Sequence, residues 1–246
     1  MSHQPYTGNE LEVFAKASHW KAYYTRHIAP YFGPRVLEVG AGLGATTAVM
    51  CDGSQAEWIC LEPDASMAAE IDRKIRAGQL PSCCASRVGT VDSLPPGERF
   101  DTIVYIDVLE HIEDDRRELR EASLRLRPGG HLIVLSPAYP FLYSPFDRAI
   151  GHFRRYTRAS LAACAPDTCR VVKIFHLDSV GVFTSLANRF LLHQDIPTEK
   201  QILLWDNRLL PVSKLLDPLF AYRLGRSVIG VWQRTDLENR PLAKVR

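Results

Sequence analysis

Short apolar runs alternate with amphipathic stretches along most of the chain. Helical periodicity predicts helices that begin near residue 43 and that cover 66–78 and 114–126. When strands and helices alternate in this way, the strands form a parallel sheet with helices on both faces. We therefore predict an α/β fold, a doubly wound, Rossmann-like and mostly parallel sheet. The seven runs that predict its strands are 35–39, 56–62, 86–89, 101–106, 129–136, 170–175 and 226–233.

Two segments lie outside this alternation. Residues 9–29 carry apolar side chains at helical spacing and predict an N-terminal helix. Residues 178–222 predict an apolar helical insertion before the last strand, with Asp178 placed to cap its first helix. Pro211 and Pro218 are expected to interrupt the second half of the insertion. Its periodicity does not separate a lid over a substrate from a dimer interface or from plain core.

Composition and length favour one domain over residues 1–246, with its core at 35–176. The chain is 46% hydrophobic and 24% charged, which is ordinary for a globular protein, and its formal net charge of +2 favours neither a nucleic acid nor an acidic partner. No signal peptide and no run near the roughly 18 apolar residues of a membrane span are visible, so we expect a cytoplasmic protein. The six cysteines lack metal-ligand or CxxC spacing, so we expect reduced thiols and no metal site.

A glycine-rich turn, in VLEVGAGLGATT (36–47), follows the first predicted strand. Gly40 and Gly42 fit a loose dinucleotide pattern, and Glu62 stands about 20 residues on, where a ribose-binding acid is expected. Yet Glu38 precedes the first glycine, and a carboxylate near a pyrophosphate costs about 1 kcal/mol even when well screened. A ligand with an ammonium group reverses that sign. S-adenosylmethionine carries an amino group and a sulfonium, and its ribose hydroxyls suit Glu62.

Four ordered motifs resemble the class I S-adenosylmethionine-dependent methyltransferases. They are VLEVGAGLG, the acid Glu62 at the end of the second strand, FDTIVYIDVLEHI (100–112) and LRPGG (126–130). The resemblance covers residues from about 9 to 176 and, loosely, the final strand. It implies that S-adenosyl-L-methionine is the cosubstrate, that Glu38 supports its amino-acid end and that Glu62 holds both ribose hydroxyls.

The chain departs from this family after the third strand, where many members carry an acid for the adenine amino group. Thr90 stands at that position in GTVDSLP (89–95), so adenine contact is left to the backbone of Val91 and to Asp92. A polar residue after a strand is also a common turn former, which is the alternative for Asp92. The predicted cofactor-binding residues are Glu38, Gly40, Ala41, Gly42, Gly44, Glu62, Val91, Asp92 and Asp107.

Methyl transfer is an in-line displacement at an activated carbon, so the enzyme mainly aligns the acceptor, and a base is needed only for hydroxyls and acidic carbons. His111, just after the fourth strand, is a candidate base because imidazole titrates near neutrality. The alternative is that His111 fixes the loop around it. With Glu110 as its only neighbouring ligand, it does not indicate a metal site.

The polar loop SPFDRAIGHFRRYT (144–157) follows the fifth strand and offers a second set of candidates. His152 is a plausible base, Tyr156 can orient an acceptor, and Arg155 can bind a carboxylate bidentately. The alternative is a structural ion pair between Asp147 and an arginine. The predicted catalytic residues are His111, His152 and Tyr156, and the predicted substrate-binding residues are Tyr143, Asp147, Arg155 and Tyr24. Tyr24 lies on the N-terminal helix, where aromatic residues either close over the cosubstrate or pack as core.

These features together predict a methyltransferase that acts on a small-molecule acceptor. We expect no nucleic-acid partner and no membrane span, and a homodimer is possible. Three alternatives remain. The chain can catalyse another reaction of the same cosubstrate, such as cyclisation or aminocarboxypropyl transfer. It can be a nicotinamide-dependent oxidoreductase, or a binding protein without activity, because fold does not fix function.

Overall fold

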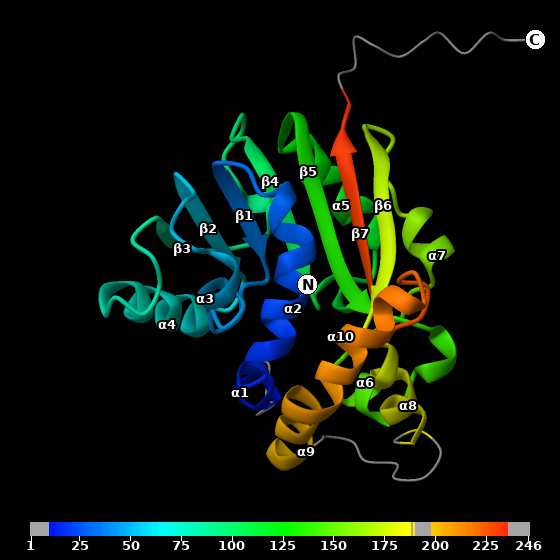
Figure 1. The fold of residues 1–246 in the computed structure, drawn as a ribbon. Coiled ribbons are helices and arrows are strands. Elements are labelled where there is room, and N and C mark those ends of the chain that lie inside the picture. Colours follow the sequence, from blue (N-terminus) through cyan, green and yellow to red (C-terminus); the bar gives the residue numbers. More distant parts are fainter. Residues whose placement is uncertain (1–9, 188, 190–197, 236–246) are drawn as a thin grey trace, which may run out of the picture.

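Seven strands form one sheet in the computed structural model, which describes residues 10–187, 189 and 198–235. The strand order is β3-β2-β1-β4-β5-β7-β6, as Figure 1 shows. Neighbours from β3 to β5 pair in parallel, and β7 runs antiparallel between β5 and β6. The strands are β1 (Arg35–Val39), β2 (Glu57–Glu62), β3 (Cys84–Val88), β4 (Phe100–Ile106), β5 (Leu126–Pro137), β6 (Cys169–Leu177) and β7 (Ser227–Arg234). The predicted fold class is confirmed.

The sheet buries apolar side chains on both faces. In β5, Ile133 and Leu135 join a cluster with α2 and the helices that follow β6, whereas Leu132 and Val134 join α5 and α7 on the opposite face. Successive strand residues alternate between faces, which explains this division. The helices are α1 (Glu10–Ala15), α2 (Ser18–Ile28), α3 (Thr47–Met50), α4 (Ala65–Arg76), α5 (Asp115–Leu124), α6 (Pro145–Ala149), α7 (Arg158–Ala162), α8 (Ser179–Ala187), α9 (Glu199–Leu204) and α10 (Leu210–Leu219), with short 3-10 turns η1 (Ala29–Tyr31), η2 (Val91–Ser93), η3 (Leu109–His111) and η4 (Pro140–Leu142).

The third strand begins earlier than its predicted range of 86–89. β3 starts at Cys84 and ends at Val88, and it lies at one edge of the sheet, paired with β2 alone among the described strands. Most of its side chains are partly or fully exposed, so its apolar pattern is weak. An edge strand of this kind is poorly marked by hydrophobicity.

The prediction of one N-terminal helix over residues 9–29 is wrong, because the chain breaks between α1 and α2. The buried Asp206 accepts hydrogen bonds from the backbone amides of His19 and Trp20, at 3.1 and 2.8 Å, and so caps the start of α2. The partners are 187 and 186 residues apart. A cap supplied from so far along the chain leaves no local pattern in the sequence.

The insertion after β6 packs into the core through Ile202, Trp205 and Leu210. Asp178 accepts a hydrogen bond from the amide of Gly181 at 3.0 Å, as expected of a helix cap. The predicted interruption at two prolines is wrong: a π-helical segment, Trp205–Leu209, joins α9 to α10, with one proline in the first turn of α10 and the other inside it. Among the residues with described structure, no helix is both long and apolar enough to cross a membrane.

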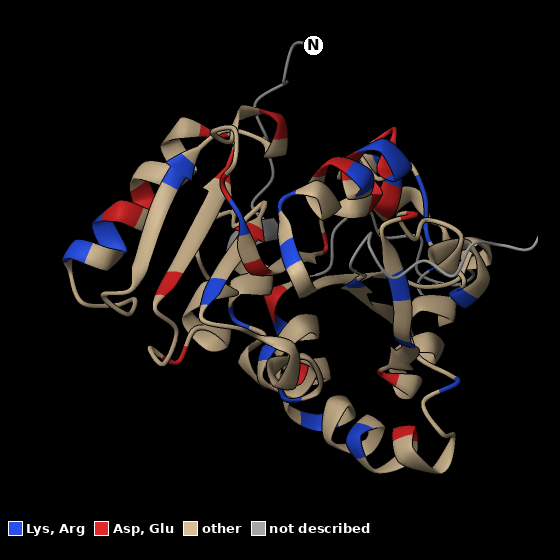
Figure 2. Cartoon of the chain, turned by 90° about the horizontal axis from the view of Figure 1, so that it is seen from above, with Lys and Arg blue, Asp and Glu red and all other residues tan. Residues whose placement is uncertain are grey.

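Charged side chains of both signs are interspersed on the helices. Figure 2 shows Lys and Arg beside Asp and Glu on the same helices, which agrees with a formal net charge of +2. No separated basic stripe is visible in that view of the described chain. The expectation of no nucleic-acid partner nevertheless stays a prediction.

Candidate functional site

The glycine turn after β1 borders open space at a single glycine. Gly40, Gly42 and Gly44 have φ angles of 69°, 56° and 74°, a region that favours glycine. A Cβ on Gly40 would lie 2.6 Å from Val108, and one on Gly44 would lie 3.3 Å from Ile71. A Cβ on Gly42 would meet no described atom within 4 Å. Gly40 and Gly44 are therefore required by packing, and Gly42 is where the backbone faces a possible ligand.

Glu62 lies at the end of β2, and its carboxylate reaches this turn. One oxygen accepts the amide of Gly42 at 2.8 Å, and the other accepts the amide of Asp64 at 3.0 Å. The structure thus brings Glu62 and Gly42 together at the turn.

Glu38 is buried beneath the turn. Its Oε2 accepts hydrogen bonds from Thr47 Oγ1 at 2.7 Å and from Trp58 Nε1 at 2.8 Å. Burial raises the pKa of Glu38 to about 7, and the negative charge of Glu62 adds to that rise. The two hydrogen bonds act in the opposite direction. Glu38 therefore ties β1 to α3 and β2. This bracing role was not part of the prediction that it contacts the cosubstrate.

Asp107 directly follows β4 with a φ of 53°. Its side chain is exposed to solvent, yet the protein around it raises its pKa to about 6 by desolvation. The neighbouring Arg226 and Lys21, with His152, oppose that rise. Asp107 thus lies accessible at the carboxyl end of β4, and ligands bind at the carboxyl ends of the strands in such sheets.

His152 and Asp147 form a buried pair in the loop after β5. Asp147 accepts from His152 Nδ1 at 2.9 Å, from Arg155 at 2.7 and 2.9 Å, and from the amide of Ser144 at 2.8 Å. Burial opposes the charge, but the bonds from His152 and Arg155 outweigh it and hold the pKa of Asp147 well below its usual range. Asp147 is therefore a fixed anion that orients the imidazole.

The other side of the His152 ring faces Glu110 and His111. Glu110 Oε1 lies 3.7 Å from His152 Nε2, beyond hydrogen-bond range, and has no partner among the described residues. Burial and the charge of Asp107 raise the pKa of Glu110 well above its usual value. The His111 ring meets the His152 ring edge-on at 4.6 Å, and burial with the neighbouring His152 lowers the pKa of His111 to about 4. His111 is therefore neutral near pH 7.

Comparison with known proteins points to methyltransferases. A methyltransferase-domain model matches residues 37–132. The ubiquinone biosynthesis O-methyltransferase of Bradyrhizobium diazoefficiens is 30% identical over 105 residues, 42% of this chain and 39% of that protein. The demethylmenaquinone methyltransferase of Tropheryma whipplei is 26% identical over 164 residues, 63% of this chain and 62% of that protein. The matches thus span less than two thirds of either relative.

A solved structure extends the likeness to almost the whole fold. The geranyl diphosphate methyltransferase in complex with SAM superposes with a TM-score of 0.62 and 15% identity, covering 95% of this chain and 93% of that one. Residues 37–132 thus match a methyltransferase domain, and the whole chain has the fold of S-adenosylmethionine-dependent methyltransferases. The glycine turn, Glu62 and Asp107 lie at the carboxyl ends of β1, β2 and β4, on one rim of the sheet.

Several predicted residues of the methyltransferase are committed to internal contacts. The Tyr156 hydroxyl is buried and donates to Asp115 at 2.7 Å, so the structure makes it an anchor of the loop and not a group that meets an acceptor. Arg155 and Asp147 pair with each other, which is the structural alternative for both. Tyr24 is 1% exposed and packs edge-on against Trp20 at 5.4 Å, so it is core and not a substrate contact.

The remaining candidates lie around the same rim. The Tyr143 hydroxyl donates to the backbone carbonyl of His152 at 2.6 Å and supports the loop. Val91 is buried, and the exposed Asp92 lies 3.5 Å from Arg117, which leaves its adenine contact a prediction. Ala41 is buried within the turn and its amide donates to the carbonyl of Leu61 at 3.2 Å.

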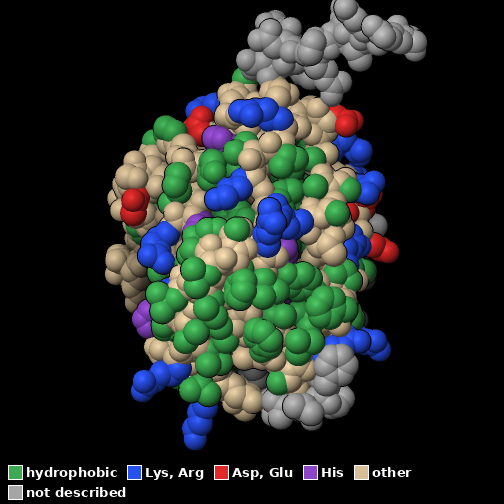
Figure 3. Space-filling view, turned by 45° about the vertical axis from the view of Figure 1, so that its right-hand side comes forward, with side chains coloured by type: hydrophobic (Ala, Val, Ile, Leu, Met, Phe, Trp, Pro, Cys, Tyr) green, Lys and Arg blue, Asp and Glu red, His purple; other side chains and the backbone are tan. Residues whose placement is uncertain are grey.

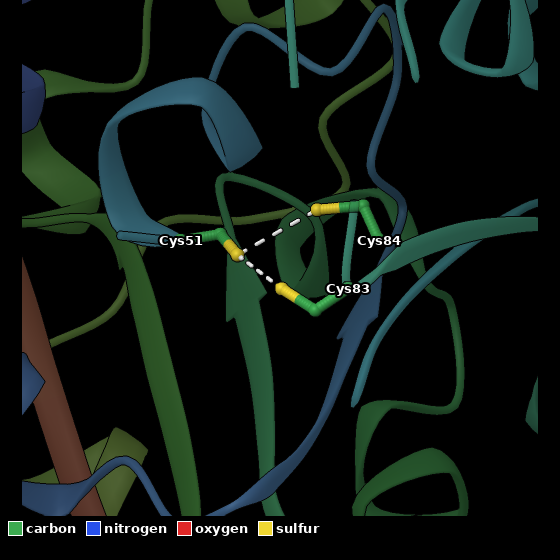
Figure 4. Close-up of side chains that lie close together, drawn as sticks. All are labelled: Cys51, Cys83 and Cys84. Atoms are coloured by element: carbon green, nitrogen blue, oxygen red, sulfur yellow. Dashed lines mark hydrogen bonds between the residues drawn. The ribbon is translucent and has the colours of Figure 1, made fainter. Parts of the chain in front are cut away.

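Two side-chain groups escaped the sequence reasoning. The ligand atoms of Glu110, His111 and His152 lie within 4.8 Å of one another, which requires the loop after β5 to fold back on η3. The Sγ atoms of Cys51, Cys83 and Cys84 also converge, with Cys51 3.5 Å and 3.6 Å from the other two (Figure 4). All six cysteines are free thiols in the structure, as predicted.

Proposed function

We propose that this methyltransferase transfers a methyl group from S-adenosyl-L-methionine to the hydroxyl of a small-molecule acceptor. The observation that carries the proposal is the open space at Gly42 beside the Glu62 carboxylate, together with the accessible Asp107 at the end of β4, the strand that pairs with β1. A cationic amino acid joined to a nucleoside fits this donor and acceptor set, because both carboxylates favour positive charge and hydroxyl donors. The residues present therefore fit the cosubstrate.

Three parts of the site would hold the cosubstrate. Glu62 would accept the two ribose hydroxyls with its carboxylate, and the turn at Gly42 would allow close backbone approach. Asp107 would offer a negative charge at the end of β4. When bound, S-adenosyl-L-methionine supplies a methyl carbon activated by sulfonium. The protein's own task is then to align the acceptor and remove its proton.

His152 is the residue that we propose for that proton. Its Nδ1 is engaged by the Asp147 anion, which favours the tautomer with the hydrogen on Nδ1 and the lone pair on Nε2. Nε2 has no close internal partner, since Glu110 Oε1 lies 3.7 Å away. A histidine held by a carboxylate in this way can accept a proton from a hydroxyl. His111, neutral and edge-on to His152, helps to hold the ring.

The names of these two relatives refer to ubiquinone biosynthesis and demethylmenaquinone, which supports a quinone-type small molecule, and a tRNA U34 carboxymethyltransferase that is 31% identical over 111 residues makes transfer RNA the acceptor to test against it. Incubation with methyl-labelled S-adenosyl-L-methionine and a panel of phenols, quinone precursors, amines and transfer RNA tests the proposal. We expect label in a hydroxylated small molecule and S-adenosylhomocysteine as the second product. Methylthioadenosine would indicate another reaction of the same cosubstrate, and label in RNA alone would contradict the acceptor class.

A further inference from the structure

The outward side of α8 and α10 presents large apolar side chains to solvent. Leu215 and Leu219 are 74% and 78% exposed, and Phe183 of α8 is 63% exposed. Val212, Leu215 and Leu219 recur at three- and four-residue spacing, so they form one stripe along α10. Figure 3 shows hydrophobic side chains gathered where these helices lie, with Lys and Arg around them. We call this surface the α10 face: Phe183, Val212, Leu215, Leu219 and Phe220, with Arg208, Lys214 and Arg223 beside them.

The α10 face carries positive charge without negative charge. Between residues 207 and 225 the chain has three basic residues and one acid, Asp217. Asp217 is fully buried, where it accepts the Tyr23 hydroxyl at 2.9 Å and the amide of Ser179 at 2.9 Å. The single acid of this segment thus points inward. Arg208 and Arg223 are exposed, and Lys214 is partly exposed.

Buried contacts fix this orientation of the helices. Asp178 accepts hydrogen bonds from Ser213 Oγ at 2.7 Å and from Trp205 Nε1 at 3.0 Å. Asp206 caps the start of α2 by accepting the amide of Trp20. Each of these carboxylates ties the insertion to another element. Rotating α10 to hide its leucines would expose Asp217 and break these bonds. The apolar stripe is therefore a built feature of the surface and not a sign of loose packing.

We propose that the α10 face docks this protein onto the surface of a bilayer that contains anionic lipids. Leucine and phenylalanine side chains that protrude among Lys and Arg fit the boundary between acyl chains and negative headgroups. Interfaces between proteins instead pair charges of opposite sign across the two surfaces, whereas anionic headgroups match a face that carries positive charge. The proposal does not depend on which reaction the site catalyses.

Sedimentation of the full chain with vesicles tests this proposal, using phosphatidylcholine alone and phosphatidylcholine mixed with phosphatidylglycerol. We expect the protein to bind the anionic vesicles about tenfold more tightly than the neutral ones. The double variant Leu215→Glu/Leu219→Glu should lose at least about tenfold in binding to anionic vesicles. Arg208→Glu/Arg223→Glu should remove the preference for anionic over neutral vesicles.

Leu124→Glu is the matched control, because Leu124 is 41% exposed on α5, which covers the opposite face of the sheet. Its vesicle binding should equal that of the wild type. Thermal melting and S-adenosylhomocysteine binding check that each variant is folded. The proposal is overturned if the folded wild type stays in the supernatant, or if the two leucine substitutions leave sedimentation unchanged. It is also overturned if those leucines support only self-association in sedimentation velocity without vesicle binding.

Discussion

His152 Nδ1 lies 2.9 Å from Asp147 Oδ1, and the same oxygen accepts Arg155 Nε at 2.7 Å. The imidazole is therefore oriented by an anion that is itself clamped. Ser144 and Asp147 form a capping box at the start of α6, which fixes the carboxylate further. The polar loop thus holds the His152 ring in place, and Arg155 is engaged in that support.

Replacing Asp147 with asparagine tests this arrangement. Asp147→Asn removes the charge that favours a hydrogen on Nδ1, so we expect turnover to fall by about a hundredfold or more while S-adenosylhomocysteine affinity stays within about threefold. Steady-state kinetics and calorimetry measure the two effects. Glu70→Gln, which breaks an exposed ion pair with Arg73, serves as the control and should change neither. An equal loss of cosubstrate affinity would place the loop in the cosubstrate pocket.

Gly42→Val should abolish S-adenosylhomocysteine binding in a folded protein. The added Cβ would meet no described protein atom within 4 Å, so the valine side chain would extend into the space that we assign to the ligand. Gly78 is a matched control, because it has a φ of 68° and equally open surroundings after α4. Both substitutions carry similar backbone strain, of about 1–2 kcal/mol. Calorimetry should then separate the two variants, and near wild-type binding by Gly42→Val would remove the turn from the cosubstrate site.

The sheet, the glycine turn and Glu62 could be predicted because their signals are local. Buried strands read as apolar runs, and an acid that ends a strand reaches the turn of the neighbouring strand. The Asp147–Arg155 pair was foreseen as an alternative, since both lie in one short loop. The cap that Asp206 provides to α2 could not be foreseen, because 187 residues separate it from His19. Tyr156 was assigned to catalysis wrongly, since nothing near it in sequence reveals its partner Asp115.

Tyr156→Phe should affect stability more than activity. Its hydroxyl donates to a buried, charged acceptor, Asp115, so its loss should cost about 1.5–3 kcal/mol of unfolding free energy. Arg154 still pairs with Asp115 at 2.8 Å, which keeps that carboxylate from being stranded. Turnover at saturating substrates should stay close to wild type. A large fall in turnover without a change in urea midpoint would return Tyr156 to the acceptor site.

Glu62→Ala should weaken S-adenosylhomocysteine binding by tenfold or much more. Hydrogen bonds from hydroxyls to a charged acceptor contribute roughly 1.5–3 kcal/mol each, and two are expected here. The substitution also removes the acceptor for the amide of Gly42, which loosens the turn. Glu62→Gln separates these effects, since the amide oxygen can still accept one bond. If calorimetry gave the same dissociation constant for all three proteins, the ribose would lie elsewhere.

The binding of S-adenosylhomocysteine should strengthen as pH rises through about 6. Desolvation raises the pKa of Asp107 from 3.8 to about 6, so the carboxyl is largely protonated at pH 5 and ionised at pH 7. Only the ionised form attracts the ligand's ammonium group, so affinity must increase with pH across this window. Glu38, with a pKa of about 7, adds a second rise at slightly higher pH. Asp107→Asn should therefore remove the part of the rise centred near 6 and keep the later part. A pH profile that Asp107→Asn leaves unaltered would show that Asp107 does not face the bound amino group.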